Sequence, residues 1–159
     1  MTQNSTILRP KIALYEPDIP QNTAAIIRTC ACLGAKLEII EPCGFLLTDK
    51  RFKRVVMDYL DHNQILYYQS ADEFFKTKKS QNQRIVLMTT KSSISYTKFN
   101  FNSDDTILFG RESAGVPENI HQLIKDRLKI PMNNSVRSLN IASSVAIVLA
   151  ESLRQIGTI

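Results

Sequence analysis

The stretch ILFGRESAGVPENI (residues 107–120) runs from an apolar segment through two glycines to a helix start at Pro117. Gly110 and Gly115 have the G-x-x-x-x-G spacing of a phosphate-binding loop. Lys and then Ser or Thr would follow in such a loop, but Val116 and Pro117 stand there, so the groups that bind a nucleoside triphosphate are missing. The stretch therefore predicts a strand leading into a helix at the carboxyl edge of a sheet. Ligands of open α/β sheets bind at this edge, and Gly110 would let the backbone approach one closely.

On both sides of this stretch, short apolar runs alternate with amphipathic segments of helical period. Strands are expected at residues 11–17, 36–42, 64–69, 84–91, 105–110 and 128–132. Helices are expected at residues 20–34, 49–60, 70–79, 117–126 and 138–157. Residues 92–104 are polar and irregular. This alternation predicts an α/β fold with a mostly parallel sheet flanked by helices, in a single domain over residues 1–159.

The composition is that of an ordinary globular protein, with 43% hydrophobic and 22% charged residues in a chain of 159. The opening MTQNSTILR lacks the apolar core of a signal peptide, and no apolar run is long enough to span a bilayer. A cytoplasmic location without membrane contact is therefore expected. The net charge of +5 permits an anionic partner without identifying it.

The three cysteines are Cys30, Cys32 and Cys43, and this small odd number argues against a disulfide framework. Cys30 and Cys32 are two positions apart on a predicted helix, so their side chains point to different faces. The two histidines lie far from them in sequence. We therefore expect buried reduced thiols and no metal site.

The final predicted helix is apolar on nearly all sides, which predicts that it is buried on nearly all sides. In so small a chain, a second copy covering the outer side would account for this pattern. An ordinary core helix with one loosely covered side is the alternative. Its apolar residues are Leu139, Ile141, Ala142, Val145, Ala146, Ile147, Val148, Leu149, Ala150 and Leu153.

Three groups of polar residues stand at the expected strand ends and helix starts. Asn22 and Arg28 lie on the first helix, Glu112 follows Gly110, and Ser138 and Asn140 precede the last helix. Taken singly, each has a structural explanation. Arg28 would be a surface salt-bridge partner, Glu112 would face the positive end of the next helix, and Ser138 and Asn140 would cap the last one.

In this order, the three groups resemble the SPOUT methyltransferases, in particular the TrmL branch of tRNA (cytidine/uridine) 2′-O-methyltransferases. The resemblance extends over residues 11–157, outside which lies an extension at residues 1–10 that is expected to be flexible. Residues 92–104 also fall outside it. The matching segments are LYEPDIPQNTAAIIRTCACLGAKLEIIEPCGF, DKRFKRVVMDY, LMTTK, LFGRESAGVP and IPMNNSVRSLNIASSVAIVLAE.

The resemblance implies a C-terminal trefoil knot, a homodimer and methylation of a ribose 2′-hydroxyl at the wobble nucleotide of tRNA. The nucleotide at position 34 would be cytidine or modified uridine, with leucine tRNA the expected substrate and the anticodon stem-loop the part that is bound. Alternatives are 2′-O-methylation of another RNA, such as ribosomal RNA, and an RNA-binding dimer without catalysis. A nucleotide-dependent dehydrogenase is excluded because no G-x-G-x-x-G follows the first strand.

Positions that match the family's motifs give the expected site residues. The cofactor would be S-adenosylmethionine, released as S-adenosylhomocysteine, and contacted by Met88, Gly110, Ile130 and Ser138. The residues expected to carry the reaction are Arg28, Glu112, Ser138 and Asn140, with Asn22 holding the first loop. Arg28 is either the base or a clamp that binds a substrate phosphate, since an unperturbed guanidinium stays protonated. Glu112 would order its loop and Arg28.

Four cations on the second predicted helix are expected to contact the RNA backbone, whose phosphates attract cations without regard to sequence. They are Lys50, Arg51, Lys53 and Arg54. A solvated charged face is the alternative for any one of them. No metal and no DNA partner is expected. The sequence departs from the family pattern at Ala24, where Gly is usual, and at Arg111, where Pro is frequent.

Overall fold

The computed structural model describes residues 7–57, 65–136 and 138–159. The strands are β1 (Lys11–Tyr15), β2 (Leu37–Ile40), β3 (Ile65–Tyr68), β4 (Ile85–Met88), β5 (Thr106–Phe109) and β6 (Asp126–Leu128). The helices are α1 (Pro20–Leu33), α2 (Lys50–Met57), α3 (Ala71–Ser80), α4 (Glu118–Leu123) and α5 (Ile141–Gln155), with a 3₁₀ turn η1 (Tyr96–Lys98). Within these ranges no helix is long and apolar enough to cross a bilayer.

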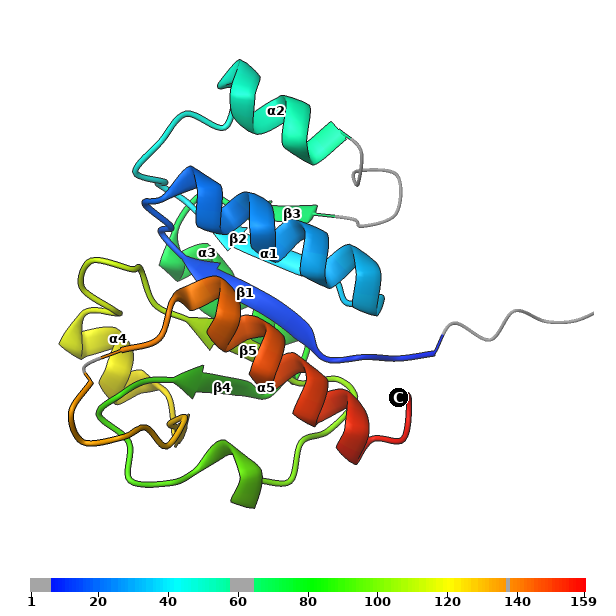
Figure 1. The fold of residues 1–159 in the computed structure, drawn as a ribbon, viewed down its shortest axis with the longest axis vertical. Coiled ribbons are helices and arrows are strands. Elements are labelled where there is room, and N and C mark those ends of the chain that lie inside the picture. The colour runs from blue at the N-terminus through cyan, green and yellow to red at the C-terminus, as the bar shows by residue number, and fades with distance from the viewer. Residues whose placement is uncertain (1–6, 58–64, 137) are drawn as a thin grey trace, which may run out of the picture.

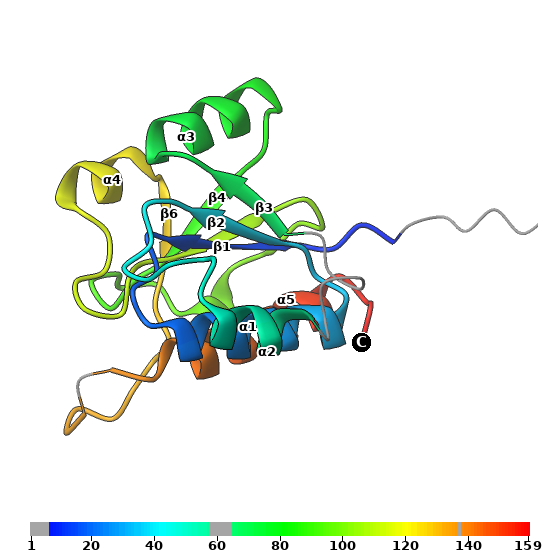
Figure 2. The same cartoon turned by 90° about the horizontal axis from the view of Figure 1, so that it is seen from above.

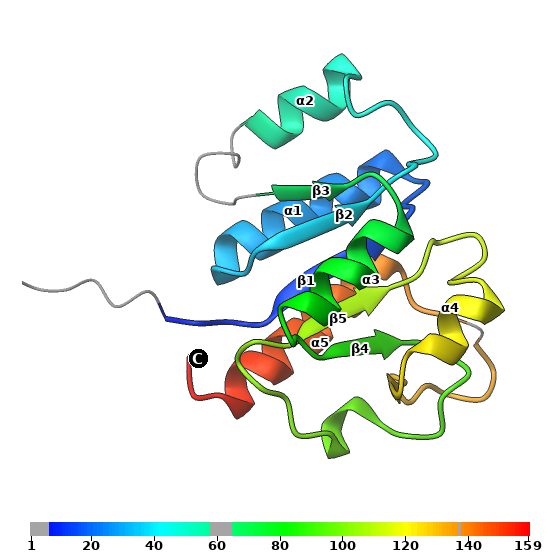
Figure 3. The same cartoon turned by 180° about the vertical axis from the view of Figure 1, so that it is seen from behind.

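The strands form one six-stranded sheet in the order β3-β2-β1-β5-β4-β6, and every pair of neighbours is parallel. Figure 1 shows the sheet behind α1 and α5, and Figure 2 shows α1, α2 and α5 together on one face with α3 and α4 on the other. Figure 3 views the second face, with α3 and α4 in front of the strands. The predicted α/β class with a parallel sheet flanked by helices is therefore confirmed.

The core is divided by the sheet, and β1 shows how the sequence achieves this. Successive residues of a strand point to opposite faces. Ile12 and Leu14 join the cluster beneath α1 and α5, whereas Ala13 and Tyr15 join the cluster beneath α3 and α4. All four are buried, because helices cover both faces. This explains why β1 is a continuous apolar run after Lys11, with no alternation of apolar and polar residues.

Helix ends agree with the sequence at α1 and α3 but not at the last two helices. Gly34 ends α1 with a φ of 72°, and the Ser70 side chain caps α3 by accepting from the Glu73 N–H. The predicted start of the last helix at residue 138 is wrong, since α5 begins at Ile141 with Asn140 as its cap. The predicted helix at 117–126 is shorter as α4, because residues 126–128 belong to the sheet.

The sixth strand was expected at residues 128–132 and lies at Asp126–Leu128. It is an edge strand that pairs only with β4 within the described sheet, so its polar Asp126 and Arg127 are tolerated there. Lys129 continues it by one isolated bridge to Ser95, and Pro131 cannot donate to a ladder. Residues 58–60 of the second predicted helix, residue 64 of the third predicted strand and residues 1–6 of the N-terminal extension lie outside the described residues.

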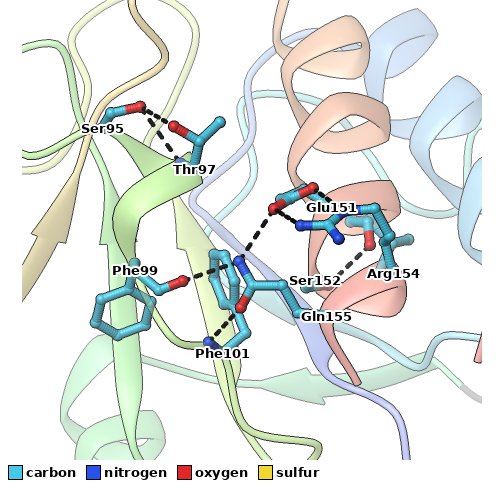
Figure 4. A network of polar contacts seen from close by, with 9 residues as sticks. Ser95, Thr97, Phe99, Phe101, Glu151, Ser152, Arg154 and Gln155 are labelled. Atoms are coloured by element: carbon cyan, nitrogen blue, oxygen red, sulfur yellow. Dashed lines mark hydrogen bonds and ion pairs between the residues drawn. The ribbon is translucent and has the colours of Figure 1, made fainter. Parts of the chain in front are cut away.

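The irregular segment 92–104 is attached to the end of α5 by the side chain of Gln155 (Figure 4). Its Nε2 donates to the Phe99 carbonyl at 2.9 Å, and its Oε1 accepts from the Phe101 N–H at 2.9 Å. Nε2 also lies 3.1 Å from Glu151 Oε1, which holds the amide in one orientation. One side chain thus satisfies two backbone groups of a segment that has little regular structure of its own.

Replacing Gln155 by Ala is expected to lower the free energy of unfolding by about 1–3 kcal/mol, because the Phe99 carbonyl and the Phe101 N–H lose these partners. Thermal unfolding measures this loss as a decrease in Tm of about 2–4 °C per kcal/mol. Arg154→Ala is the matched control, since Arg154 is 66% exposed and pairs with Glu151 on the surface. An equal decrease in Tm for both variants would contradict the role of the Gln155 side chain in attaching the segment 92–104 to α5.

Candidate functional site

A cavity of about 540 Å³ lies at the carboxyl ends of β4 and β5. Its walls come from these strand ends, from the chain between β6 and α5, and from the first turns of α1 and α5. Figure 1 shows the chain after β5 and the chain before α5 meeting at this edge of the sheet. The four residues predicted to contact the cofactor all line it: Met88, Gly110, Ile130 and Ser138. Asn22, Glu112 and Asn140 line it as well.

One wall of the cavity is a tight hairpin that follows β5. Arg111 and Gly115 exchange two backbone hydrogen bonds, of 3.3 and 2.8 Å, and Gly115 adopts a φ of 66°. A Cβ at Gly110 would lie 2.6 Å from the Gly115 carbonyl carbon and Cα. The backbone that must approach Gly110 is therefore that of Gly115, so the hairpin itself requires this glycine.

The first and third groups of predicted residues are joined by a direct contact. Asn140 Oδ1 caps α5 by accepting from the N–H groups of Ala142 and Ser143, at 2.9 and 3.3 Å. Its Nδ2 donates to Asn22 Oδ1 at 3.0 Å, although the residues are 118 positions apart. Asn140 thus both caps α5 and contacts the first turn of α1.

The second group joins the first through Glu112 and the segment before α1. Glu112 Oε2 accepts from the Asp18 N–H at 3.2 Å, and Ser113 Oγ donates to Asp18 Oδ2. A side-chain hydrogen bond between the carboxyl groups of Asp18 and Glu112 lowers the pKa of Asp18 from its ordinary 3.8. Burial, and after it the hydrogen bond with Asp18, raises the pKa of Glu112 from its ordinary 4.5. The two carboxyl groups therefore bind one proton more readily than two separate acids would.

Arg111, one of the two departures from the family pattern, forms a second tie between the same segments. Its guanidinium pairs with the carboxylate of Glu16 and lies 5.5 Å from the centre of the Tyr15 ring. Glu16 follows β1 directly and adopts a φ of 42°, which is unusual for a residue with a side chain. The charge that Arg111 adds near the cavity is thus matched by a carboxylate.

Arg28 and the four cations of α2 lie elsewhere. Arg28 is exposed on α1 and is absent from the cavity lining of the described chain. Lys50, Arg51, Lys53 and Arg54 are all exposed on α2, whose first turn is capped by Asp49 Oδ1. Phe52 and Val56 on the same helix are buried, which fixes the cationic side outward.

Several residues of the cavity were missed by sequence reasoning. They include Thr89, Thr90 and Lys91 after β4, and Met132 after β6. Asp18, which holds Glu112, was also missed. Thr89 and Asp18 follow the carboxyl ends of β4 and β1 within a few residues, so the rule that ligands bind at this edge could have singled them out. Met132 ends the strand predicted at residues 128–132, so the same rule also points to it, although β6 itself ends at Leu128.

The lining fits the S-adenosylmethionine that the resemblance implies. The cavity volume is within the usual range for small-molecule sites, about 300–1,000 Å³. Apolar side chains such as Met88 and Ile130 line the cavity together with the Gly110 backbone. A sulfonium requires that no unpaired cation face it. Among the described lining residues, the cations Lys91 and Arg111 each have a carboxylate partner, Glu118 at 4.0 Å and Glu16.

Comparison with protein families and curated proteins gives consistent matches. The model of the SpoU rRNA Methylase family matches residues 9–150. A tRNA (cytidine(34)-2′-O)-methyltransferase of Beijerinckia indica is 47% identical over 148 residues, which cover 93% of this chain and 92% of that protein. The protein of the same description from Escherichia coli is 36% identical over 148 residues, covering 92% and 93%.

Solved structures are similar over nearly the whole chain. A structure described as giving insights into the 2-OH methylation of C/U34 on tRNA superposes with a TM-score of 0.88 at 36% identity, covering 94% of this chain and 97% of that one. The SpoU methyltransferase AviRb of Streptomyces viridochromogenes, in complex with AdoMet, superposes with a TM-score of 0.85 at 23% identity. The superposed region covers 96% of this chain and 62% of AviRb. At this identity, the similarity shows a common fold and nothing more.

Proposed function

The chain belongs to the SpoU rRNA methylase family, and from this premise we propose that it methylates the ribose 2′-hydroxyl of nucleotide 34 in tRNA, with S-adenosylmethionine as the methyl donor. The observation that carries this proposal is the 47% identity to a tRNA (cytidine(34)-2′-O)-methyltransferase over more than nine-tenths of both chains. The acceptor nucleotide is cytidine or modified uridine, and the protein acts in the cytoplasm. The predicted trefoil knot belongs to this proposal.

Met88, Gly110, Ile130 and Ser138 hold the donor in the cavity at the carboxyl ends of β4 and β5. Bound S-adenosylmethionine supplies a methyl group that is electrophilic because it is attached to a sulfonium. The apolar side chains of Met88 and Ile130 would flank its adenine, and backbone N–H and C=O groups would be available to its edge. The hairpin of residues 110–115 closes one side, and its shape depends on Gly110.

The reacting hydroxyl enters beside Asn22 and Asn140, which line the cavity and hold each other. This contact fixes the starts of α1 and α5, and such positioning lowers the barrier by up to about 7–11 kcal/mol. Arg28 on α1 would bind the phosphate next to the acceptor ribose and polarise the hydroxyl, whose proton passes to solvent during the transfer. Its guanidinium is too weak an acid to serve readily as the base.

The protein works as a homodimer that binds the anticodon stem-loop. Val145, Val148 and Leu149 of α5 are buried within one chain, but Ile147 remains 37% exposed on the same helix and Leu139 is 42% exposed before it. A second copy covers Ile147 and Leu139, although the polar Ser143 and Arg154 are exposed on the same helix. Lys50, Arg51, Lys53 and Arg54 of α2 contact the RNA backbone, so binding weakens as the salt concentration increases.

The proposal is tested by incubating the protein with labelled S-adenosylmethionine and unmodified tRNA and mapping the methylated nucleotide. Label is expected on the 2′-oxygen of nucleotide 34, and leucine tRNA should be the best substrate. The same tRNA already methylated at this position is the matched control and should accept no label. In a parallel incubation with ribosomal RNA, label on ribosomal RNA and none on tRNA would show that ribosomal RNA is the substrate. Cofactor binding without transfer to any RNA would leave an RNA-binding dimer without catalysis.

A further inference from the structure

Two segments that frame the cavity meet through a pair of carboxyl groups. Asp18 precedes α1, which carries Asn22, and Glu112 belongs to the hairpin after β5. Each carboxyl group has one oxygen with a donor: Glu112 Oε2 accepts from the Asp18 N–H, and Asp18 Oδ2 accepts from Ser113. The loop after β2 also packs closely against Asp18, since a Cβ at Gly44 would lie 2.7 Å from Asp18 Cβ.

The second oxygen of each carboxyl group is buried without a partner. Asp18 Oδ1 and Glu112 Oε1 have neither an N–H nor an O–H donor among the described residues. Two ionised carboxylates here would leave two buried charged oxygens uncompensated, which is costly. A proton on one of them would let the two carboxyl groups form a hydrogen bond between an acid and a carboxylate.

We propose that Asp18 is a positioning residue for the methyl transfer: its carboxyl group shares one proton with Glu112, and the shared proton holds the start of α1 against the hairpin that closes the cofactor cavity. The positioning role rests on the proposed function. The shared proton is a property of the chain alone and is tested separately.

The charged surroundings are consistent with a proton held between these two groups. On the two segments, the remaining charges are Glu16 and Arg111, which pair with each other. Lys91, after β4, lies against Glu118, and the neighbouring helix starts present the neutral side chains of Asn22 and Asn140. The other basic groups on the elements that meet here are Arg28 on α1 and His121 on α4, which lines the same cavity.

The shared proton has a definite sign in the pH dependence of stability. The folded pKa of Glu112 is raised from 4.5, so the stability that its proton contributes is present below this pH and is lost as the pH rises through the raised value. The folded pKa of Asp18 is lowered from 3.8, so its contribution is lost only as the pH falls further into the acid range. The contact is therefore strongest at mildly acidic pH.

The first test compares thermal unfolding of the full chain and of Asp18→Asn without ligand, between about pH 5 and pH 8. An amide at position 18 donates an N–H to Glu112 at every pH and still accepts from Ser113. The Tm of the variant is therefore expected to increase relative to the wild type as the pH rises. Glu16→Gln, which weakens the other tie between the same segments, should shift Tm by an offset that keeps the wild-type pH dependence. Parallel curves for Asp18→Asn and the wild type would overturn the shared proton.

The second test measures methyl transfer and S-adenosylhomocysteine binding. Asp18→Ala is expected to lower kcat on tRNA about 10- to 100-fold, and Asp18→Asn should restore most of it. A purely structural role would lower Tm equally in both variants and leave kcat unchanged, which would overturn the positioning role. Absence of transfer by the wild-type protein would instead refute the proposed function, while the unfolding curves would still decide whether the proton is shared.

Discussion

Replacing Arg28 by Ala is expected to lower turnover on tRNA by about 10²–10⁴-fold and to leave the affinity for S-adenosylmethionine nearly unchanged. Arg28 is exposed on α1 and is not among the described residues that line the cavity, so the variant keeps the cofactor wall intact. What it removes is a permanent cation beside the acceptor ribose. Single-turnover methyl transfer measures the first effect, and calorimetric titration with S-adenosylhomocysteine measures the second.

The matched control for Arg28→Ala is Cys32→Ala, one turn further along the same helix. It should retain both turnover and affinity. The expectation of a buried thiol is wrong for Cys32, which is exposed, whereas Cys30 is buried. Arg28→Lys separates the two roles left open by the sequence through the pH dependence of turnover. A clamp would keep part of its activity with an unchanged pH profile, because the ammonium still binds a phosphate as a point charge, whereas a base would shift the profile to lower pH, because an ammonium loses its proton more readily than a guanidinium. Equal loss of turnover and cofactor affinity in Arg28→Ala would show that Arg28 supports the cofactor site and not the RNA.

Replacing Gly110 by Ala is expected to weaken S-adenosylhomocysteine binding about 10- to 100-fold and to lower stability by about 1–3 kcal/mol. The new Cβ would lie 2.6 Å from the Gly115 carbonyl carbon and Cα and 2.8 Å from the Val116 nitrogen. All three are backbone atoms, so no rotamer change relieves the overlap. The hairpin must move, and with it the contact between Glu112 and Asp18.

Gly115→Ala distinguishes this collision from the general cost of losing a glycine in the hairpin. A Cβ there meets no described atom within 4 Å, but the φ of 66° disfavours any side chain, at about 1–2 kcal/mol. This variant should lose stability and keep most of its affinity. Calorimetric titration and thermal unfolding of both proteins make the comparison. Wild-type affinity in Gly110→Ala, or equally weak binding in the two variants, would contradict the argument.

Much of the sheet could be predicted from the sequence because β1, β2, β4 and β5 are largely buried and consist mostly of apolar residues. The edge strand β6 could not, since Asp126 and Arg127 give no apolar signal and its neighbour decides the pairing. The start of α5 was ambiguous for a similar reason. Ser138 and Asn140 are both good caps, and the structure shows Asn140 as the cap, with a further contact to Asn22 that the sequence does not reveal.

The cavity was predictable from the family resemblance more than from the residues. Met88, Gly110 and Ile130 were assigned by matching motifs, and the structure brings them to one cavity, although their contacts with the cofactor stay a prediction. Local periodicity carries no information on which distant segments meet. Asp18 was missed because it reads as a loop acid beside a proline, and its importance depends on Glu112, 94 positions away. The predicted knot also stays a prediction, since residue patterns do not encode chain threading.

The central place of β1 in the sheet has a consequence for how the protein is made. Its neighbour on one side, β2, follows closely, but on the other side Lys11 pairs with Thr106, 95 positions later. At a synthesis rate of about 5–20 residues per second, this partner emerges about 5–20 s after β1. Until then, the N-terminal half of the nascent chain exposes the edge of β1 that later pairs with β5, and an exposed strand edge favours association with other chains. The yield of folded protein in cells should therefore depend on chaperones that shield nascent chains and on the speed of translation.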